Sequence, residues 1–164
     1  MKRGGPARSV YPMGKRALVL LADGFEEVEA VAPIDLLRRA GVETVVAAVG
    51  DGLAVTGKNG ITVHADALLS ETDGGSFDAL VLPGGPAAKS LRENETVLAL
   101  VRSFRESDRL VGAICAAPTI LLRAGILDGK RYTAHFSVVE DLPEILVEPV
   151  VGDDGVPTTR HHPA

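Results

Sequence analysis

The single cysteine of the chain, Cys115, lies between the apolar run Leu110–Ile114 and the segment Ala116–Ala124, which has helical spacing. This pattern predicts a sharp strand-to-helix turn, which the small residues Ala113 and Ala117 would allow to close. A helix N-terminus stabilises negative charge, so we expect the turn to lower the pKa of the thiol and to favour the thiolate. Cys115 is therefore interpreted as a nucleophile or a redox thiol; the alternative interpretation is a buried structural cysteine.

Two glycines, Gly84 and Gly85, follow another apolar run, Ala79–Leu82. Because glycine has no Cβ, its backbone N–H can approach a ligand closely. With the N–H of Ala116, the two glycines are predicted to hold the negative oxygen of a tetrahedral adduct formed at the cysteine. The alternative is that Pro83-Gly84-Gly85 is an ordinary loop sequence.

Three glutamates, Glu26, Glu27 and Glu29, begin a second segment with helical spacing. We interpret Glu26 and Glu27 as solvated side chains that complement the positive end of the helix dipole. Glu29 lies one turn further along an apolar stripe and is expected to point inward. A carboxyl group in an apolar site keeps its proton at neutral pH, so Glu29 beside Cys115 would donate a hydrogen bond to the thiolate and then carry protons. The alternative is that Glu29 is a third solvated glutamate.

His135 follows Tyr132–Ala134, a short predicted strand that would end at the same edge of the sheet. There it would act as a base beside the thiol, or it is an ordinary polar residue at a strand end; the pattern leaves both open. His64 is interpreted as a structural residue of a hairpin strand, and His161 and His162 as part of a tail. No Asp, Glu or His spacing matches a metal motif and no glycine-rich phosphate loop follows a strand, so neither a metal nor an organic cofactor is expected.

Apolar runs and segments with helical spacing alternate along the chain. The predicted strands are Arg16–Ala22, Thr44–Val49, Ala79–Leu82 and Leu110–Ile114. The predicted helices are Glu26–Ala40, with apolar Val28, Val31 and Leu36, then Glu95–Ser107 and Ala116–Ala124. Two hairpins are predicted, one through Leu53–Val55 and Ile61–Val63 and a terminal one through Val147–Val151 and Val156–Thr159. This alternation predicts an α/β, doubly wound sheet with helices on both faces, in which ligands bind outside the carboxyl ends of the strands.

Composition and charge exclude several classes of protein. One cysteine cannot form an intrachain disulfide or a Cys-rich zinc site. With 17 Lys and Arg against 22 Asp and Glu, the net charge is −5, which gives no electrostatic reason to bind nucleic acid or an anionic membrane. The longest uncharged apolar stretch, Leu110–Leu122, is much shorter than the ~20 residues of a membrane span. The cytoplasm is therefore the expected location.

The length predicts one domain, which we place at residues 15–160. Residues 1–14 are rich in glycine, proline and basic residues without periodicity and are expected to form a disordered arm. Met13 is an alternative start of the chain, and residues 161–164 are expected to form a short tail.

Three segments together, Asp23–Glu29, Leu82–Gly85 and Ala113–Pro118, resemble the motifs of the ThiJ/PfpI superfamily. The similarity is closest to its Parkinsonism-associated (DJ-one) branch, which includes bacterial deglycase-like proteins, and it extends from about residue 15 to residue 160. The resemblance implies a flavodoxin-like fold, a homodimer and chemistry that needs no cofactor.

The resemblance also implies roles for individual residues. In the family, the glutamate that matches Glu29 is protonated and hydrogen-bonds the reactive cysteine that matches Cys115, and a histidine that matches His135 assists in some members. The backbone donors of the family match Gly84, Gly85 and Ala116. The implied activity is that of a cysteine-dependent glyoxalase or deglycase that acts on methylglyoxal-type aldehydes or early glycation adducts. The alternatives are a redox sensor or chaperone that responds to oxidative stress through cysteine oxidation, and an inactive truncated member.

The sequence differs at four points from patterns found in the family or in related proteins. Ala116 stands where the protease-like branch has a histidine, which argues against peptidase chemistry. The late His-x-Glu pair of the glutamine amidotransferases, which share the turn, is absent, and Phe136 stands where the family usually has a proline. After Arg160 the family continues with a loop and a long helix, so we expect the C-terminal helix of the family to be lacking.

Overall fold

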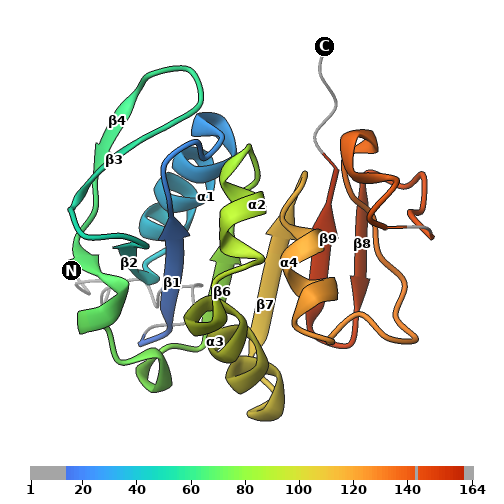
Figure 1. Cartoon of the computed structure of the whole chain (residues 1–164). Helices are drawn as coiled ribbons and strands as arrows, with labels where there is room; N and C mark the ends of the chain where they lie inside the picture. The colour runs from blue at the N-terminus through green and yellow to red at the C-terminus, as the bar shows by residue number, and fades with distance from the viewer. Residues whose placement is uncertain (1–13, 143, 161–164) are drawn as a thin grey trace, which may run out of the picture.

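A seven-stranded sheet forms the middle layer of the structure, in the strand order β5-β2-β1-β6-β7-β9-β8 (Figure 1). The computed structural model describes residues 14–142 and 144–160. The strands are β1 Arg16–Leu21, β2 Glu43–Ala48, β5 Ala67–Leu68, β6 Ala79–Leu82, β7 Leu110–Ile114, β8 Val150–Asp153 and β9 Val156–Thr159. All neighbouring strands in this order are parallel except β8 and β9. The predicted α/β fold with a mostly parallel sheet is confirmed, while the predicted arm up to residue 13 and the tail 161–164 lie outside the described residues.

The central strand β1 is hydrophobic because both of its faces are covered. Each residue from Ala17 to Leu21 is at most 1% exposed. The strand pairs in parallel with β2 on one side and with β6 on the other. A continuous apolar run is typical of a strand in this position, and it explains why β1 was recognisable from the sequence. The parallel arrangement brings the carboxyl ends of β1, β6 and β7 to one edge of the sheet.

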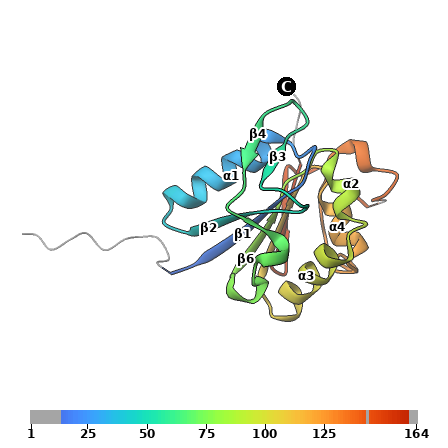
Figure 2. The same cartoon turned by 60° about the vertical axis from the view of Figure 1, so that its left-hand side comes forward.

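Helices cover both faces of the sheet. The α-helices of the described residues are α1 Glu27–Arg39, α2 Ala87–Leu91, α3 Glu95–Glu106 and α4 Pro118–Arg123. Short 3₁₀ helices occupy Leu69–Glu71, Gly74–Ser76 and Phe136–Val138. Helix α1 lies on one face, and α2, α3 and α4 lie on the other (Figure 2). The two-sided cover predicted from the sequence is confirmed, although neither α2 nor β5 was predicted.

Two hairpins extend this core. The first, β3 Ala54–Thr56 with β4 Thr62–His64, is antiparallel and lies beside α1, one residue later than predicted (Figures 1 and 2). In the terminal hairpin, the predicted strand Val147–Val151 is wrong, since β8 is Val150–Asp153. Asp154 and Gly155, with φ of 43° and 71°, make the turn. Positive φ at both turn residues is the type I′ geometry that an Asp-Gly pair favours, and it places the turn later than predicted.

The apolar residues that gave α1 its helical spacing do not lie on its buried face, although Glu29 points inward as predicted. Val28, Val31 and Leu36 are 63%, 45% and 64% exposed, whereas Ala30 and Ile34 face the core. Glu26 and Glu27, predicted to be solvated, are 7% and 5% exposed. The glutamates are buried because each has hydrogen-bond donors: the Glu26 carboxylate accepts from the Glu29 N–H, and Glu27 accepts from the β3–β4 turn. Hydrogen bonds to these carboxylates therefore set the rotation of the helix more strongly than its apolar spacing.

The predicted strand Tyr132–Ala134 is also absent from the sheet. Its backbone groups form hydrogen bonds outside any strand pairing: the Thr133 N–H donates to Thr158 Oγ1 at 2.9 Å, and the Tyr132 carbonyl accepts from the Leu146 N–H at 3.0 Å. The Thr133 hydroxyl in turn donates to the Leu146 carbonyl at 2.8 Å. Within residues 14–142 and 144–160, no helix has the length and apolar character that crossing a membrane requires.

Candidate active site

Cys115 occupies a strained turn between β7 and α4. Its φ is 63°, in the left-handed region that residues with a side chain rarely adopt, at a cost on the order of 1–3 kcal/mol. Two hydrogen bonds fix the turn: the Cys115 N–H donates to the Thr159 carbonyl at 2.9 Å, and the Cys115 carbonyl accepts from the His135 N–H at 2.8 Å. The predicted strand–Cys–helix turn therefore exists, and the thiol lies half-buried at the carboxyl end of β7.

Glu29 projects from the first turn of α1 toward Cys115. Its side chain is 3% exposed, and it is hydrogen-bonded to the Cys115 side chain. The N–H of Gly84 donates to Glu29 Oε2 at 3.0 Å. A Cβ at position 84 would lie 2.6 Å from that oxygen and 2.7 Å from Cys115 Cβ, so only glycine fits between the two groups. The Gly84 N–H, predicted to hold an oxyanion, instead holds the Glu29 carboxyl in this structure.

The other two predicted backbone donors face the sulfur. The N–H groups of Gly85 and Ala116 hydrogen-bond Cys115 and favour its thiolate. Gly85 has φ of 87°, and a Cβ there would lie 2.6 Å from both the Glu26 nitrogen and the Gly24 carbonyl oxygen. The loop after β6 can therefore approach the start of α1 only because it carries glycine.

Burial, the charge of Glu29 and the hydrogen bond with Glu29 raise the pKa of Cys115 to about 12, against the donors Gly85 and Ala116. This direction is opposite to the predicted lowering. The α4 helix has only six residues. The lowering of the thiol pKa by its N-terminus is therefore smaller than the increase caused by burial and by the neighbouring carboxylate. Because the thiol and the carboxyl cannot both be ionised at neutral pH, the Cys115–Glu29 pair retains one proton there.

His135 lies at the pocket mouth, and its ring is oriented by the residues that follow it. Nδ1 accepts a hydrogen bond from the Ser137 N–H at 3.2 Å and lies 2.8 Å from Ser137 Oγ. The ring also packs against Phe136, with 4.1 Å between centroids. An Nδ1 that accepts from a backbone N–H leaves the proton of the neutral ring on Nε2. In this tautomer Nε2 is a hydrogen-bond donor, which adds a third role to the base and the ordinary polar residue that the sequence left open.

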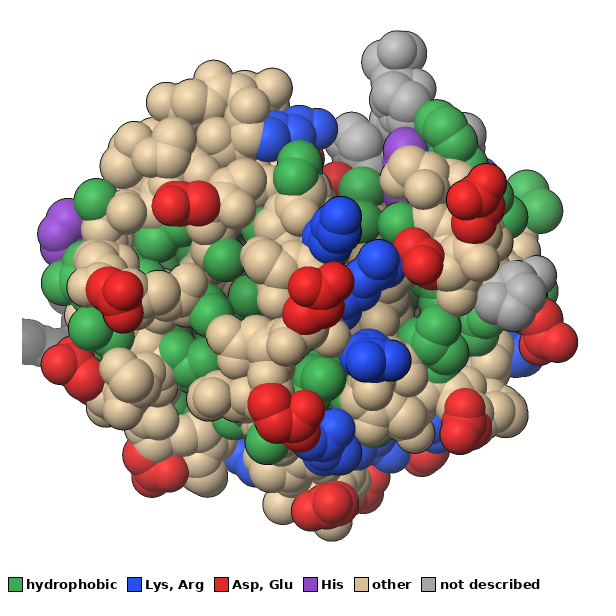
Figure 3. All heavy atoms as spheres, viewed as in Figure 1, with side chains coloured by type: hydrophobic (Ala, Val, Ile, Leu, Met, Phe, Trp, Pro, Cys, Tyr) green, Lys and Arg blue, Asp and Glu red, His purple; other side chains and the backbone are tan. Residues whose placement is uncertain are grey.

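A pocket of about 600 Å³ opens above Cys115. Of the predicted site residues, the pocket is lined by Cys115, Glu29, His135, Gly85 and Ala116. Sequence reasoning missed the basic residues of the same wall, which are Lys58, Lys89 and Arg92. On this face of the molecule, Lys and Arg side chains gather between α2 and α4 (Figure 3). Among residues 14–142 and 144–160, no three His, Cys, Asp or Glu side chains are grouped so as to hold a metal ion.

Sequence reasoning also missed the contact that holds the hairpin over the site. Glu27 Oε1 accepts from the Asn59 N–H at 2.6 Å, and Oε2 accepts from Asn59 Nδ2 at 2.9 Å. Burial alone would raise the pKa of Glu27, but hydrogen bonds from the N–H groups of Glu27, Asn59 and Ile61 and from the Asn59 amide outweigh it, and the pKa is lowered. The sequence signal was the turn Gly57-Lys58-Asn59-Gly60, whose asparagine offers donors to an acidic partner.

A family model described as the DJ-1/PfpI family matches residues 15–164, and the chain belongs to this family. Deglycase TK1284 of Thermococcus kodakarensis is 37% identical over 150 residues, which cover 89% of this chain and 90% of that protein. Protein dj-1beta of Drosophila melanogaster is 39% identical over 131 residues, covering 79% and 70%. The crystal structure of Drosophila DJ-1beta superposes with a TM-score of 0.86 at 36% identity, covering 91% of this chain and 83% of that one. The family predicted from the three motifs is confirmed.

Proposed function

We propose that this member of the DJ-1/PfpI family is a cofactor-independent, cysteine-dependent glyoxalase or deglycase that acts on methylglyoxal-type aldehydes or early glycation adducts. The observation that carries the proposal is the hydrogen-bonded pair of Cys115 and Glu29 on the floor of the pocket. A thiol and a carboxyl that retain one proton between them supply a nucleophile and an acid at the same time. The relatives named as deglycases support the same class of activity.

The first step is addition of the thiol to the aldehyde. Cys115 passes its proton to Glu29 as Cys115 Sγ bonds to the aldehyde carbon, and the carbonyl electron pair moves to the oxygen. The N–H groups of Gly85 and Ala116 stabilise that oxygen as the sulfur loses its charge. Glu29 then delivers its proton to the oxygen, which gives a hemithioacetal and leaves Glu29 as a carboxylate.

The second step is an internal redox isomerisation. The Glu29 carboxylate removes the hydrogen of the carbon bonded to sulfur as a proton, and the electron pair forms an enediolate with the neighbouring ketone. His135 gives its Nε2 proton to the ketone oxygen as charge grows there, and it takes back the hydroxyl proton of the carbon bonded to sulfur, so that the thioester carbonyl can form. Glu29 returns the proton to the former ketone carbon, so that one carbon is oxidised by two electrons and the other is reduced by two. Water then hydrolyses the thioester, which releases the hydroxy acid and restores the thiol.

Replacement of the nucleophile tests the proposal. Cys115→Ser should reduce the turnover of methylglyoxal to lactate by more than about 10³-fold, because a serine hydroxyl in the same place is far harder to ionise. Thermal unfolding of the variant, followed by circular dichroism, controls for folding. A folded Cys115→Ser protein that retains turnover would rule out the mechanism.

The same thiol supports a second candidate function, that of a redox sensor. Cys115 is half-buried at a pocket rather than fully enclosed, and two backbone N–H groups face its sulfur. These donors would stabilise a sulfenate or sulfinate formed by peroxide. Mass spectrometry after mild peroxide, alongside the turnover assay, separates the two functions. Stable oxidation at Cys115 without turnover would favour the sensor.

A further inference from the structure

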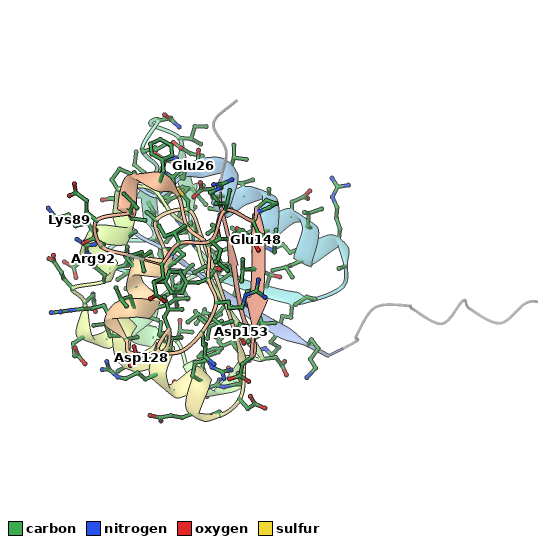
Figure 4. The ribbon with its side chains drawn as sticks, turned by 90° about the vertical axis from the view of Figure 1, so that its right-hand side faces the viewer. Glu26, Lys89, Arg92, Asp128, Glu148 and Asp153 are labelled. Atoms are coloured by element: carbon green, nitrogen blue, oxygen red, sulfur yellow. The ribbon has the colours of Figure 1, made fainter. Side chains whose placement is uncertain are left out.

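The pocket above Cys115 carries positive charge that the proposed reaction at Cys115 does not use. Three basic side chains line it: Lys58 from the β3–β4 turn, Lys89 from α2 and Arg92 from the end of α2. The acidic residues of the lining are Glu29 and Asp141, in a chain whose net charge is −5. Lys89 and Arg92 lie close together on the same side of the molecule (Figure 4). The pocket therefore concentrates cations within an acidic protein.

Two of these cations are poorly neutralised. Arg92 forms a close ion pair with Asp141 at 2.8 Å, which uses its charge to join the end of α2 to the segment after the Phe136–Val138 helix. Lys58 approaches Glu26 only to 3.8 Å. Among the described residues, no acidic group lies within 4.0 Å of the Lys89 ammonium. Lys58 and Lys89 are thus available for a ligand, whereas Arg92 is engaged by the protein.

Lys58 is held at the pocket mouth by its backbone. The Lys58 N–H donates to the Phe25 carbonyl at 2.9 Å, and the next residue, Asn59, is bound through both its N–H and its amide by Glu27. A Cβ at Gly57 would lie 2.5 Å from the Glu27 carboxyl, so the turn is packed closely against α1. This anchoring fixes the backbone of Lys58, whose side chain lines the pocket.

The volume of the pocket also indicates a substrate larger than methylglyoxal. A cavity of about 600 Å³ lies within the ~300–1,000 Å³ range of sites for much larger ligands than methylglyoxal, which has few non-hydrogen atoms. A substrate that fills the pocket extends from Cys115 toward the lysines. An oppositely charged group at that end would be attracted into the site and oriented by it.

We propose that the site selects α-oxoaldehydes whose far end carries a carboxylate or phosphate group, bound by Lys58 and Lys89. This inference rests on the proposed function, because Cys115 and Glu29 perform the same chemistry on the aldehyde end. The two lysines act on binding and orientation and touch no reacting atom.

The test compares a charged substrate with its neutral ester. We measure kcat/KM for 4,5-dioxopentanoate, for its methyl ester and for methylglyoxal at low and at high ionic strength. The acid should be preferred over the ester by about 10- to 100-fold at low salt, the range expected for a hydrogen bond to a charged group. The preference should fall as salt screens the lysines. Lys58→Met and Lys89→Met should each reduce the ratio of acid to ester.

A matched control separates the local effect from the change in net charge. Lys15→Met removes the same charge near the start of β1, where Lys15 pairs with Asp78 at the opposite edge of the sheet. This variant should keep the acid-to-ester ratio of the wild type. Equal kcat/KM for acid and ester in the wild type, or a ratio that neither pocket variant changes, would overturn the inference and leave the proposed function intact.

A binding assay tests anion selection without turnover. Neither levulinate nor dihydroxyacetone phosphate has an aldehyde. Levulinate carries a carboxylate, dihydroxyacetone phosphate carries a phosphate, and methyl levulinate is the neutral counterpart of levulinate. If levulinate protects Cys115 from alkylation by iodoacetamide, the site binds a carboxylate. If dihydroxyacetone phosphate protects it, the site binds a phosphate. Protection no better than that by methyl levulinate contradicts the inference. A protein that shows selective protection but no methylglyoxal turnover would instead refute the proposed function alone.

Discussion

Glu27 and Glu29 lie two residues apart at the start of α1, and both are buried, at 5% and 3% exposed, yet their surroundings differ completely. Glu27 faces the β3–β4 turn and receives hydrogen bonds from backbone N–H groups and from the Asn59 amide. Glu29 faces the Cys115 thiol and receives a hydrogen bond from the Gly84 N–H. The first carboxylate ties a hairpin to a helix, and the second meets a group with which it can exchange a proton.

This difference shows that the partners of a buried carboxyl group, rather than its burial, determine its role. Several N–H donors satisfy a carboxylate and lower its pKa, which keeps it charged and structural. A neighbouring acid leaves the pair with a proton that either group can hold, which is useful in catalysis. Conservative glutamine substitutions at the two positions test this difference in role.

The two glutamine variants should differ most in turnover. Glu29→Gln keeps the size of the side chain but can neither accept nor deliver a proton, so kcat for methylglyoxal should fall by about 10²- to 10⁴-fold. Glu27→Gln removes a charge of equal sign two residues away and should have a much smaller effect. Steady-state kinetics of both variants gives the comparison. Similar losses in the two variants would mean that Glu29 contributes a charge or a packing contact rather than proton transfer.

The second effect is on the reactivity of the thiol. In the wild type, the Cys115–Glu29 pair holds one proton over the neutral range, so the rate of alkylation by iodoacetamide should change little with pH until the pKa of about 12 is approached. In Glu29→Gln the charge and the hydrogen bond that raised the pKa of Cys115 are removed. Its alkylation should follow an ordinary sigmoid with a midpoint below about 12.

The same measurement on Glu27→Gln provides the matched control, because Glu27 hydrogen-bonds the hairpin and is absent from the pocket lining. Its alkylation profile should follow that of the wild type. A wild-type midpoint near the free-thiol value of ~8.5 would show that the thiol titrates independently of Glu29, and would contradict the shared proton.

Local patterns predicted the strand-to-helix turn at Cys115 well and the surroundings of the glutamates poorly. The turn at Cys115 was predictable because the apolar run, the helical segment and the small residues on either side are adjacent in the sequence. The contact of Glu27 with Asn59 joins residues 32 positions apart and exists only once the hairpin has packed on α1. Glu26 and Glu27 were wrongly predicted to be solvated for the same reason: apolar spacing takes no account of hydrogen bonds that make a buried glutamate favourable.

The direction of the pKa shift of Cys115 was mispredicted for a related reason. The sequence placed a helix N-terminus next to the thiol, and this one feature predicts a lowered pKa. The structure adds a six-residue helix, partial burial and the carboxyl of Glu29, which together reverse the direction. The inward position of Glu29 was predicted, but the balance between its charge and the donors Gly85 and Ala116 depends on three-dimensional distances.

The smallest effect concerns the stability that Glu27 contributes. Its pKa is lowered from 4.5 in the folded protein, so its contribution is fully present above about pH 4.5 and is lost as the pH falls through the folded value. Glu27→Gln retains one acceptor oxygen but turns an NH₂ group toward the Asn59 donors. The variant should therefore be less stable than the wild type at pH 7, and the difference should shrink as the pH is lowered toward 3. Urea unfolding at several pH values measures it.

Glu71→Gln provides the control for this titration, since Glu71 is an exposed residue of the Leu69–Glu71 helix. Because Glu71 is exposed, the free energy of unfolding of this variant should differ little from that of the wild type. A Glu27→Gln difference that stays constant from pH 7 to pH 3 would mean that the contact acts through shape alone. A difference that disappears at low pH shows that the charge of Glu27 holds the hairpin, and with it Lys58, over the pocket.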